Sequence, residues 1–570
     1  MSEQIKITVV MSDDKQNTER EEQKSKRILL TQDPFMTLLS VLQENRLLEE
    51  SLCGGRGECG RCAVQFLSGA TIPTPLERKH FSPEELRQGY RLACIARPRT
   101  DCVIKLLKKE GVEVPILTKT IPLSEDIDLN SQGKNRSENQ TSGAMESLNG
   151  LTDEVKNNTG VMESGDHMIA VDLGTTTIAM QLYCMATGEV VDTYCEHNPQ
   201  RSYGADVLSR IQASCKGRRE ELQRLVCESL LRGLQRFLTG RLIDAAQLRC
   251  ICIAGNTAME HLLMGYDVQR LGRSPFTPVE IGVQETTLSG LFACLAGVQI
   301  GENAALMTLP VYLTPGISAF VGGDMTAGLY ALRMLPGFVD GKDLQAQDEP
   351  RVCFLIDLGT NGEIAITDGK RMLVTATAAG PAFEGSGESA LIGTDRIALT
   401  ASFLQRGILD ETGLLAEPYF SEGVPVEAED VRAAEKSGQM NTFRIRKEDI
   451  RSLQMAKAAI RAGIEILWVE MGCPRMDRVY LAGGFGYELD VEAAFAIGLL
   501  PVQLRGRVEA VGNTSLAGAF LMGRALWQGR IDRRALEEKL TSGTVIESIN
   551  LAAKENFAAL YLRYMNLEEN

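Results

Sequence analysis

Short apolar runs in the first hundred residues predict a small sheet accompanied by two helices. One helix is expected to open at Asp33, and a second at Ser82, where Pro83 and two glutamates follow a good N-cap residue. Gly89 is the expected end of the second helix. The runs expected to form strands are 5–10 (IKITVV), 27–30 (RILL) and 63–67 (AVQFL).

Two longer apolar runs repeat each other farther along the chain. Residues 168–183 (MIAVDLGTTTIAMQLY) and 353–367 (CFLIDLGTNGEIAIT) each predict a buried strand that ends in Asp-Leu-Gly-Thr, a tight turn and a second strand. A third strand is expected after each copy, and Asp368-Gly369 predicts the hairpin that leads to it in the second. Two such copies predict two similarly folded lobes that face each other.

The stretch between the first sheet and the repeats has a different composition. Residues 109–130 are expected to be extended, and 131–165 are rich in Ser, Asn, Gly and charge, which predicts a segment unable to bury a core. A flexible linker and a tolerated insertion both fit it. The expected organisation is 1–108, a first small domain; 109–166, a flexible and partly disordered linker; 167–350, lobe 1; and 351–570, lobe 2.

Composition narrows the class of function. The chain has 570 residues, a formal net charge of -15 and a pI near 5.1, which argues against a nucleic-acid partner. No apolar run reaches membrane-spanning length and the first residues lack an apolar signal core, so we expect a cytoplasmic protein without a membrane partner. With only four histidines, well separated in sequence, a multi-histidine metal site or a histidine triad is not expected.

Four cysteines carry the clearest chemistry. Cys53, Cys59, Cys62 and Cys94 follow the spacing C-x5-C-x2-C with a distant fourth cysteine, which suits a 2Fe-2S cluster, and the glycines between them allow the tight loop that a cluster needs. Structural zinc is an alternative, but zinc sites usually pair their ligands. A disulfide framework fits worse, because the other ten of the fourteen cysteines are scattered singly through apolar segments.

The turns of the repeat point to phosphate. Gly-Thr-Thr-Thr and Gly-Thr-Asn-Gly present backbone N–H groups and hydroxyls to phosphate oxygens, and an aspartate at each strand end can hold Mg²⁺ through water. A third element at 477–490 (DRVYLAGGFGYELD) predicts a strand, a glycine cluster and a helix, suited to the close approach of a nucleoside. Each motif alone is weak, but their order and spacing together are specific.

These motifs carry a family resemblance. Residues 1–108 resemble an α+β ferredoxin domain of the β-grasp type, and 166–570 resemble the α/β ATPases of the actin, sugar kinase and Hsp70 superfamily, with two RNase H-like lobes. Further blocks complete the likeness, namely 198–211 (NPQRSYGADVLSRI), 255–265 (GNTAMEHLLMG) and 316–331 (GISAFVGGDMTAGLYA). As a whole the chain resembles the reductive activators of corrinoid-dependent enzymes.

The resemblance implies an ATP-dependent activity in anaerobic metabolism. An electron taken from a low-potential ferredoxin, flavodoxin or reductase would pass through the 2Fe-2S cluster to a Co(II) corrinoid protein of a methyltransferase or O-demethylase system, giving Co(I). ATP and Mg²⁺ would be needed, and a homodimer stays an open option. The implied metal-proximal carboxylates are Asp172 and Asp357. The implied nucleotide contacts are Gly174, Thr175, Thr176, Thr177, Gly359, Thr360, Asn361, Gly362, Gly483, Gly484, Phe485 and Gly486.

Two further residues have competing interpretations. Asp324 could orient the attacking water or cap the helix that begins near Met325. Lys457 lies in a helical segment where the superfamily often places a nucleoside contact, but a solvated helix face is the alternative.

Other functions and one departure complete the expectations. Activators of 2-hydroxyacyl-CoA dehydratases share the ATPase fold but have no N-terminal ferredoxin domain, and a redox sensor or electron carrier would bind nucleotide without catalysis. Family members also carry a folded middle domain between ferredoxin and ATPase, whereas this region is expected to be short and of low complexity here.

Overall fold

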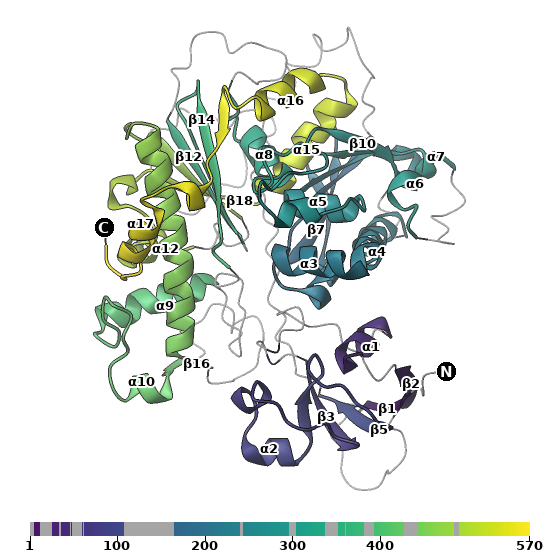
Figure 1. The fold of residues 1–570 in the computed structure, drawn as a ribbon. Coiled ribbons are helices and arrows are strands. Elements are labelled where there is room, and N and C mark those ends of the chain that lie inside the picture. Colours follow the sequence, from purple (N-terminus) through teal and green to yellow (C-terminus); the bar gives the residue numbers. More distant parts are fainter. Residues whose placement is uncertain are drawn as a thin grey trace.

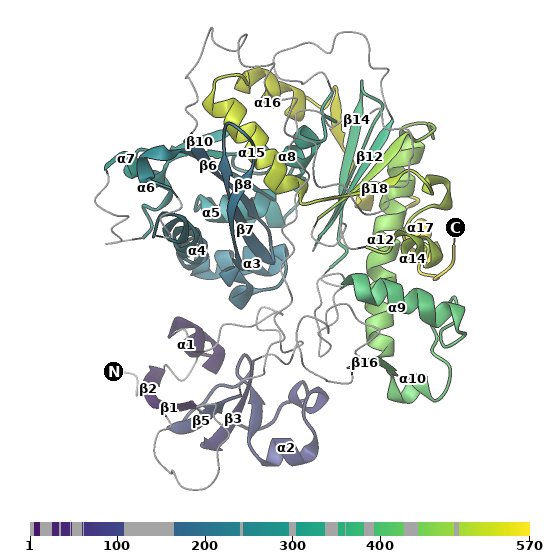
Figure 2. The same cartoon turned by 180° about the vertical axis from the view of Figure 1, so that it is seen from behind.

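Three main sheets, each built from its own stretch of chain, organise the computed structural model (Figure 1). The sheet of the small domain lies beneath two lobes in Figures 1 and 2. The structure describes residues 5–11, 26–32, 36–45, 47, 57, 60, 62–107, 165–239, 243–295, 304–336, 352–359, 361–380, 393–426, 443–483 and 489–569.

The small domain is a five-stranded sheet in the order β2-β1-β5-β3-β4, in which β1 and β5 run parallel and the other neighbours antiparallel. The apolar face of the strands packs with α1 into one core, as the alternation of apolar and polar residues predicts. Its elements are β1 Ile5–Met11, β2 Lys26–Gln32, α1 Leu38–Glu44, β3 Ala63–Ser68, α2 Pro83–Arg87, β4 Tyr90–Leu92 and β5 Cys102–Leu106.

The predicted start of α2 is confirmed, and that of α1 is shifted. Ser82 forms a capping box with Glu85, whose Oε2 accepts from the Ser82 amide at 2.7 Å. Gly89 follows α2 with φ +92°, and a Cβ there would stand 2.2 Å from the Phe66 carbonyl oxygen, so only glycine fits. In contrast, α1 begins at Leu38 because Thr37 caps it; residue 33 lies outside the described part of the chain.

Lobe 1 comprises the described residues from 165 to 336. Its six-stranded sheet has the order β10-β11-β9-β6-β7-β8. Its elements are β6 His167–Leu173, β7 Thr177–Cys184, β8 Val190–His197, the 3₁₀ helix η3 Pro199–Tyr203, α3 Val207–Ala213, α4 Arg219–Thr239, β9 Leu248–Gly255, α5 Thr257–Leu263, the 3₁₀ helix η6 Gln269–Gly272, β10 Gln284–Thr287, α6 Leu288–Leu291, α7 Ala304–Met307, β11 Pro310–Leu313 and α8 Gly323–Ala331.

Lobe 2 comprises the described residues from 352 to 569. Its six-stranded sheet has the order β18-β17-β12-β13-β14-β19, and β15 and β16 form a separate pair. Its elements are β12 Cys353–Leu358, β13 Gly362–Thr367, β14 Met372–Thr377, α9 Gly393–Gln405, α10 Tyr419–Glu422, β15 Val424–Val426, β16 Phe443–Ile445, α12 Lys447–Glu470, β17 Arg478–Ala482, α14 Val491–Ala496, β18 Val508–Gly512, α15 Thr514–Trp527, α16 Arg533–Thr541, β19 Ile546–Ser548 and α17 Phe557–Arg563.

The internal repeat is confirmed by the pairing of the strands. In lobe 1, β6 pairs antiparallel with β7, β7 antiparallel with β8, and β6 parallel with β9; in lobe 2, β12, β13, β14 and β17 pair in the same three ways. The predicted Asp368-Gly369 hairpin joins β13 to β14, with Gly369 at φ +83°. The two lobes are therefore built on the same strand plan.

The lobes meet through α8 and α15, which lie between the two sheets (Figures 1 and 2). A Cβ at Gly518 of α15 would stand 1.9 Å from the Ala327 carbonyl oxygen of α8, so the two helices touch backbone to backbone. On another face of α15, a Cβ at Gly523 would stand 2.4 Å from Cys252 of β9. The lobes thus share one apolar core, and a substitution at Gly518 would force them apart.

Two further observations concern the whole chain. Gln43 of α1 donates from Nε2 to the carbonyl of Ser202 in η3, which joins the small domain to lobe 1. None of the helices in the described ranges combines the length and the apolar character that crossing a bilayer requires.

Candidate functional site

Two of the four predicted cluster ligands lie in the described part of the small domain. Cys62 directly precedes β3 and Cys94 follows β4, and both thiols are buried. The amide of Ala93 donates to the carbonyl of Cys62 at 2.9 Å, which holds the two stretches together. Cys53 and Cys59 lie outside the described residues. Two buried thiols brought together from separate stretches suit a 2Fe-2S cluster held by cysteine sulfur.

The loop that carries the predicted ligands is supported by a histidine. Gly57 and Gly60 have φ of +77° and +68°, as the glycine-rich sequence predicts. Nε2 of His80 lies 3.0 Å from the Gly57 carbonyl oxygen, and a Cβ at Gly60 would stand 3.1 Å from Nδ1 of the same ring. No sequence pattern predicts this role, because His80 is isolated from the cysteine motif along the chain.

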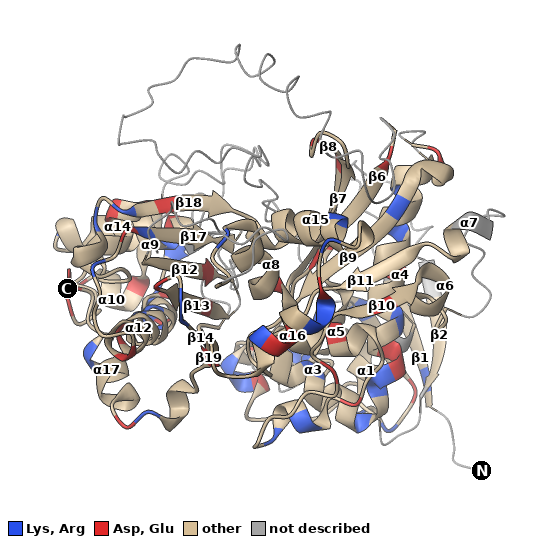
Figure 3. Ribbon diagram, turned by 90° about the horizontal axis from the view of Figure 1, so that it is seen from above, with Lys and Arg blue, Asp and Glu red and all other residues tan. Residues whose placement is uncertain are grey.

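The second candidate site lies between the lobes, where the structure brings the three predicted carboxylates together. Asp172 stands near the end of β6, Asp357 near the end of β12 and Asp324 in the first turn of α8. Figure 3 shows the acidic end of β12 facing α8 between the lobes. Glu260 of α5 and Glu363 of β13, both buried, lie close enough to add to this cluster. No sequence motif predicts either of them.

The carboxylates repel one another in a poorly solvated place. Burial raises the pKa of Asp357 to about 7, and the charges of Asp324 and Asp172 add to the rise. Burial also raises the pKa of Asp324 to about 7 and that of Asp172 to about 6. Burial, together with Asp324, holds the pKa of Glu260 and Glu363 well above the usual range. Such a cluster attracts a cation, which would relieve the repulsion.

The cluster does not form a direct metal cage. In the part of the chain that the structure describes, no three His, Cys, Asp or Glu side chains are arranged to hold a metal ion. Mg²⁺ keeps several of its waters when it binds together with phosphates. The residues present therefore fit Mg²⁺ held through water beside a nucleotide.

The first phosphate turn is held by three polar side chains from the neighbouring family blocks. Asn256, the N-cap of α5, donates to Thr175 Oγ1 at 2.9 Å. Asn198 donates from Nδ2 to the Gly174 carbonyl at 2.8 Å, and fully buried Arg210 donates to the Thr175 carbonyl. These bonds satisfy the inner polar atoms of the turn, and the side chain of Thr176 remains partly exposed.

The third motif packs against the second. Gly483, at the end of β17, has φ +88°, and a Cβ there would stand 2.6 Å from Asp357 Oδ1 and 2.7 Å from the Leu358 carbonyl oxygen. Gly359 donates its amide to the Asn361 carbonyl at 3.0 Å and closes the second turn. Four of the predicted nucleotide contacts lie outside the described residues: Thr360, Gly484, Phe485 and Gly486.

Asp324 is not the helix cap that one interpretation proposed. The helix α8 begins at Gly323, with Gly322 as its N-cap and no capping side chain. Gly322 and Gly323 are required by close packing, since a Cβ at Gly322 would stand 2.4 Å from Asn256 Cα and one at Gly323 2.5 Å from Glu260 Oε1. These two glycines allow α8 to present Asp324 to Asp172 and Asp357.

Lys457 binds the C-terminal segment of the chain. Its ammonium is completely buried in α12 and donates to the Asn566 carbonyl in the C-terminal segment. Burial lowers its pKa to about 7, and Arg461 lowers it further, against the charge of Glu568. The contacts of Lys457 thus anchor the end of the chain. The alternative of a solvated helix face is wrong for this residue.

Asn513 links the two lobes at the site. This residue of lobe 2 caps α15, with Oδ1 accepting from the Leu516 amide at 2.9 Å, and its Nδ2 donates to Asp172 Oδ2 of lobe 1 at 2.7 Å. The second bond spans 341 positions along the chain and joins a helix cap to a catalytic candidate. Asn513 therefore links the position of Asp172 in lobe 1 to a helix cap of lobe 2.

We expect Asn513→Asp to separate these two roles. Asp caps a helix as well as Asn does, but it lacks the Nδ2 donor and sets a second carboxylate against Asp172. The nucleotide-free protein should lose about 1–3 kcal/mol of stability at pH 8, and less at pH 5, where a proton shared between the carboxyls restores a donor. Thermal unfolding at the two pH values measures this.

Asn550→Asp is the matched control for that experiment. Asn550 caps the 3₁₀ helix Leu551–Ala553 on the surface, with Oδ1 accepting from the Ala552 amide at 3.1 Å. It should unfold like the parent chain at both pH values. An Asn513→Asp protein that did the same would show that the bond to Asp172 contributes nothing.

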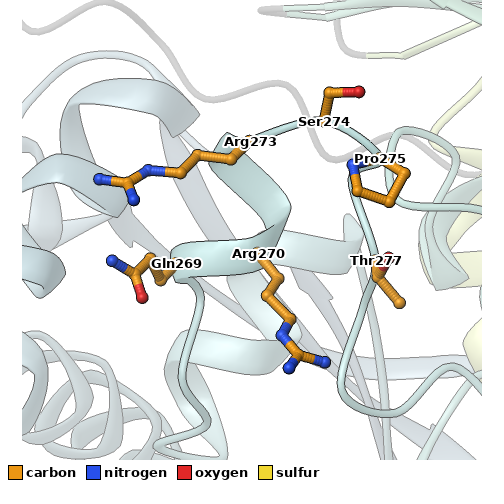
Figure 4. Close-up of a pocket in the computed structure, with 6 residues that line it drawn as sticks. All are labelled: Gln269, Arg270, Arg273, Ser274, Pro275 and Thr277. Carbon is orange, nitrogen blue, oxygen red and sulfur yellow. The ribbon is translucent and has the colours of Figure 1, made fainter.

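A cavity of about 390 Å³ lies elsewhere on lobe 1, beside η6 (Figure 4). None of its lining residues belongs to the phosphate motifs, and all of them are exposed. It is an open hollow that contains none of the clustered carboxylates. It is lined by Gln269, Arg270, Arg273, Ser274, Pro275 and Thr277.

Family models match most of the chain. Residues 21–99 match the 2Fe-2S iron-sulfur cluster binding domain, and residues 167–336 match the family described as the RACo middle region. Residues 351–390 and 388–570 match the C-terminal domain of RACo, the ASKHA domain. The family's middle region is therefore lobe 1, which corrects the expectation that the middle part is reduced here to the low-complexity segment.

Individual proteins agree with these matches. The corrinoid activation enzyme RamQ of Eubacterium limosum is 26% identical over 545 residues, which span 82% of this chain and 87% of RamQ. The [Co(II) methylated amine-specific corrinoid protein] reductase of Methanosarcina barkeri is 23% identical over 434 residues, 69% of this chain and 76% of the reductase. A solved reductive activator for corrinoid,iron-sulfur protein shares the fold, with a TM-score of 0.57, 22% identity and coverage of 99% and 98% of the two chains.

Proposed function

The chain belongs to the RACo family, and from this we propose that it is an ATP-dependent reductive activator that returns a Co(II) corrinoid protein to Co(I). The electron would come from a low-potential ferredoxin, flavodoxin or reductase in the cytoplasm. The observation that carries the proposal is the union, in one chain, of a ferredoxin domain with buried cysteines and a two-lobed site with the three nucleotide motifs.

The ferredoxin domain would hold the cluster through Cys53, Cys59, Cys62 and Cys94. A 2Fe-2S cluster, when bound, accepts and passes on one electron at a time. The chain's own contribution is to bury Cys62 and Cys94, to fix the loop through His80, and to keep water from the thiolates. These contributions keep the cluster in place and limit its exposure to solvent.

The lobes would bind Mg²⁺ and ATP between them. The backbone of the turns at Gly174 and Gly359 would face the phosphates, and Asp172 and Asp357 would hold waters of the metal. Asp324 is the candidate for orienting the attacking water, because it is close enough to Asp172 and Asp357 for their charges to interact. The protein would form no covalent bond with the phosphoryl group, because catalysis of phosphoryl transfer depends mainly on positioning and on electrostatic stabilisation.

Coupling to the electron transfer follows from the closing of the lobes. Reduction of Co(II) is expected to be uphill from a plant-type cluster, whose potential is about -400 mV. A nucleotide can supply the difference only if it binds one arrangement of the lobes more tightly than another. The Asn513–Asp172 bond and the shared α8–α15 core are structural elements through which nucleotide could favour the closed arrangement.

The rate of ATP hydrolysis tests this proposal. We expect hydrolysis to be stimulated by a corrinoid protein in the Co(II) state and not by the same protein stripped of its corrinoid. A redox sensor that only binds nucleotide should respond to neither. Equal rates with the two partner forms would contradict the proposed coupling, whatever the basal rate.

A further inference from the structure

Two cysteines of lobe 1 lie close together, away from both sites. Cys227 lies in the middle of α4, and Cys294 lies just after α6, in the turn that ends at Leu295. The Cys227 thiol donates to the carbonyl oxygen of Leu291 at 3.5 Å, three residues before Cys294, and the Cys294 side chain packs against the apolar cluster that contains Cys227. Residues far apart in sequence are thus neighbours, and each thiol shifts the pKa of the other.

The two thiols have unequal surroundings. Cys227 is completely buried, and its pKa is raised by the interaction with Cys294 and by burial. Cys294 is partly exposed, and the interaction with Cys227 lowers its pKa to about 7. Arg224, one turn before Cys227 on α4, favours the Cys294 thiolate, while Glu228 opposes it. Cys294 is therefore the accessible, nucleophilic member and Cys227 the shielded one.

Neighbouring buried cysteines lack this arrangement. Cys250 and Cys252 are buried in β9 two positions apart, and burial raises the pKa of both thiols, so they stay protonated. Each shows the ordinary behaviour of a buried cysteine as a small apolar residue. The contrast identifies the Cys227–Cys294 contact as a feature of its own.

We propose that Cys227 and Cys294 form a reversible disulfide and make lobe 1 a thiol-redox site, separate from the cluster cysteines. The oxidant is a low-molecular-weight disulfide. The Cys294 thiolate attacks one of its sulfurs and releases one small thiolate, which leaves a mixed disulfide. Cys227 then gives up its proton, attacks the protein sulfur of that mixed disulfide and releases the second small thiolate.

The step balances without any other reagent. Two protein thiols become one disulfide, one small disulfide becomes two small thiols, and the protons pass to the released thiolates. The product joins α4 covalently to the turn after α6. Excess dithiol reverses it.

Mass spectrometry of the full-length protein, treated anaerobically with oxidised glutathione, tests the proposal. We expect a peptide pair cross-linked between Cys227 and Cys294 that disappears after treatment with dithiothreitol. Cys227→Ser should stop at a stable glutathione adduct on Cys294. As the matched control, Cys215→Ser, which removes an exposed cysteine from the same lobe, should leave the cross-link unchanged.

A second measurement checks the contact itself. The rate of Cys294 alkylation should rise with pH around a midpoint near 7, and Cys227→Ala should shift that midpoint upward because the neighbouring thiol that lowers the pKa of Cys294 is gone. The proposal would be overturned by a stable glutathione adduct on Cys294 in the parent protein without the cross-link. An alkylation midpoint unmoved by Cys227→Ala would overturn it as well.

Discussion

Replacement of Asp357 by Asn is expected to lower the rate of ATP hydrolysis on the order of 100-fold or more, and at the same time to stabilise the nucleotide-free protein. The loss follows because Asp357 stands at the second phosphate turn and is proposed to hold the metal through water. The gain follows because desolvation and the charges of Asp324 and Asp172 disfavour the ionised form of Asp357 and raise its pKa. The two effects together distinguish a functional carboxylate from a structural one.

The stabilisation expected from Asp357→Asn depends on pH in a definite direction. The folded pKa of Asp357 is raised from 3.8 to about 7, so between these values the folded protein binds more protons than the unfolded one. Stability therefore falls as the pH rises from about 4 to 7, by at most on the order of 4 kcal/mol for this one group. Asn carries no charge, so the stability of the Asp357→Asn variant should fall less than that of the parent chain over this pH range.

Thermal unfolding between pH 5 and 8 measures the effect, with Asp368→Asn as the control. Asp368 lies in the hairpin after β13, where hydrogen bonds from the backbone hold its pKa below the usual range although partial burial opposes them. Its replacement should leave ATP hydrolysis intact and lower the stability of the folded protein slightly at neutral pH. This change in stability is opposite in sign to the one expected for Asp357→Asn. Asp357→Asn that hydrolyses ATP normally would remove this carboxylate from the proposed site.

Replacement of Cys94 by Ser is expected to abolish electron delivery while ATP hydrolysis persists. A serine hydroxyl does not ionise near neutral pH and is a poor ligand for iron, so the cluster should be lost or unstable. Iron content, visible absorption and Co(I) formation should all fall, whereas the lobes keep their own core and should keep basal hydrolysis.

Cys102→Ala provides the matched control in the same domain. Cys102 is equally buried, in β5, but burial raises its pKa to about 11, so its thiol stays protonated. The variant should keep a full complement of iron. If it lost the cluster and Cys94→Ser kept it, the predicted ligand set would be wrong.

Much of this molecule could be predicted from local pattern. The two copies of the three-strand start, the capping box at Ser82 and the turns near Asp172 and Asp357 each depend on a few adjacent residues, and the structure shows all of them. The matches to the ferredoxin and ASKHA families confirm the fold class drawn from those motifs.

What could not be predicted depends on contacts between distant residues. Asn513 appears in the sequence as an ordinary helix cap, and only folding brings its Nδ2 to Asp172. Glu260 appears as a residue of an apolar helix, and its place beside Asp324 depends on the packing of Gly323. The burial of Lys457, which contradicts a solvated helix face, has the same kind of cause, since its partner Asn566 lies close to the C-terminus.

The central claim is that nucleotide bound between the lobes enables the electron transfer that the ferredoxin domain performs. The direct measurement is the anaerobic absorbance of Co(I) formed from a Co(II) corrinoid protein in the presence of a chemical reductant, with and without ATP. We predict Co(I) with the parent chain plus ATP, and none without ATP, with Cys94→Ser or with Asp357→Asn. Co(I) that forms to the same extent without ATP would contradict the account.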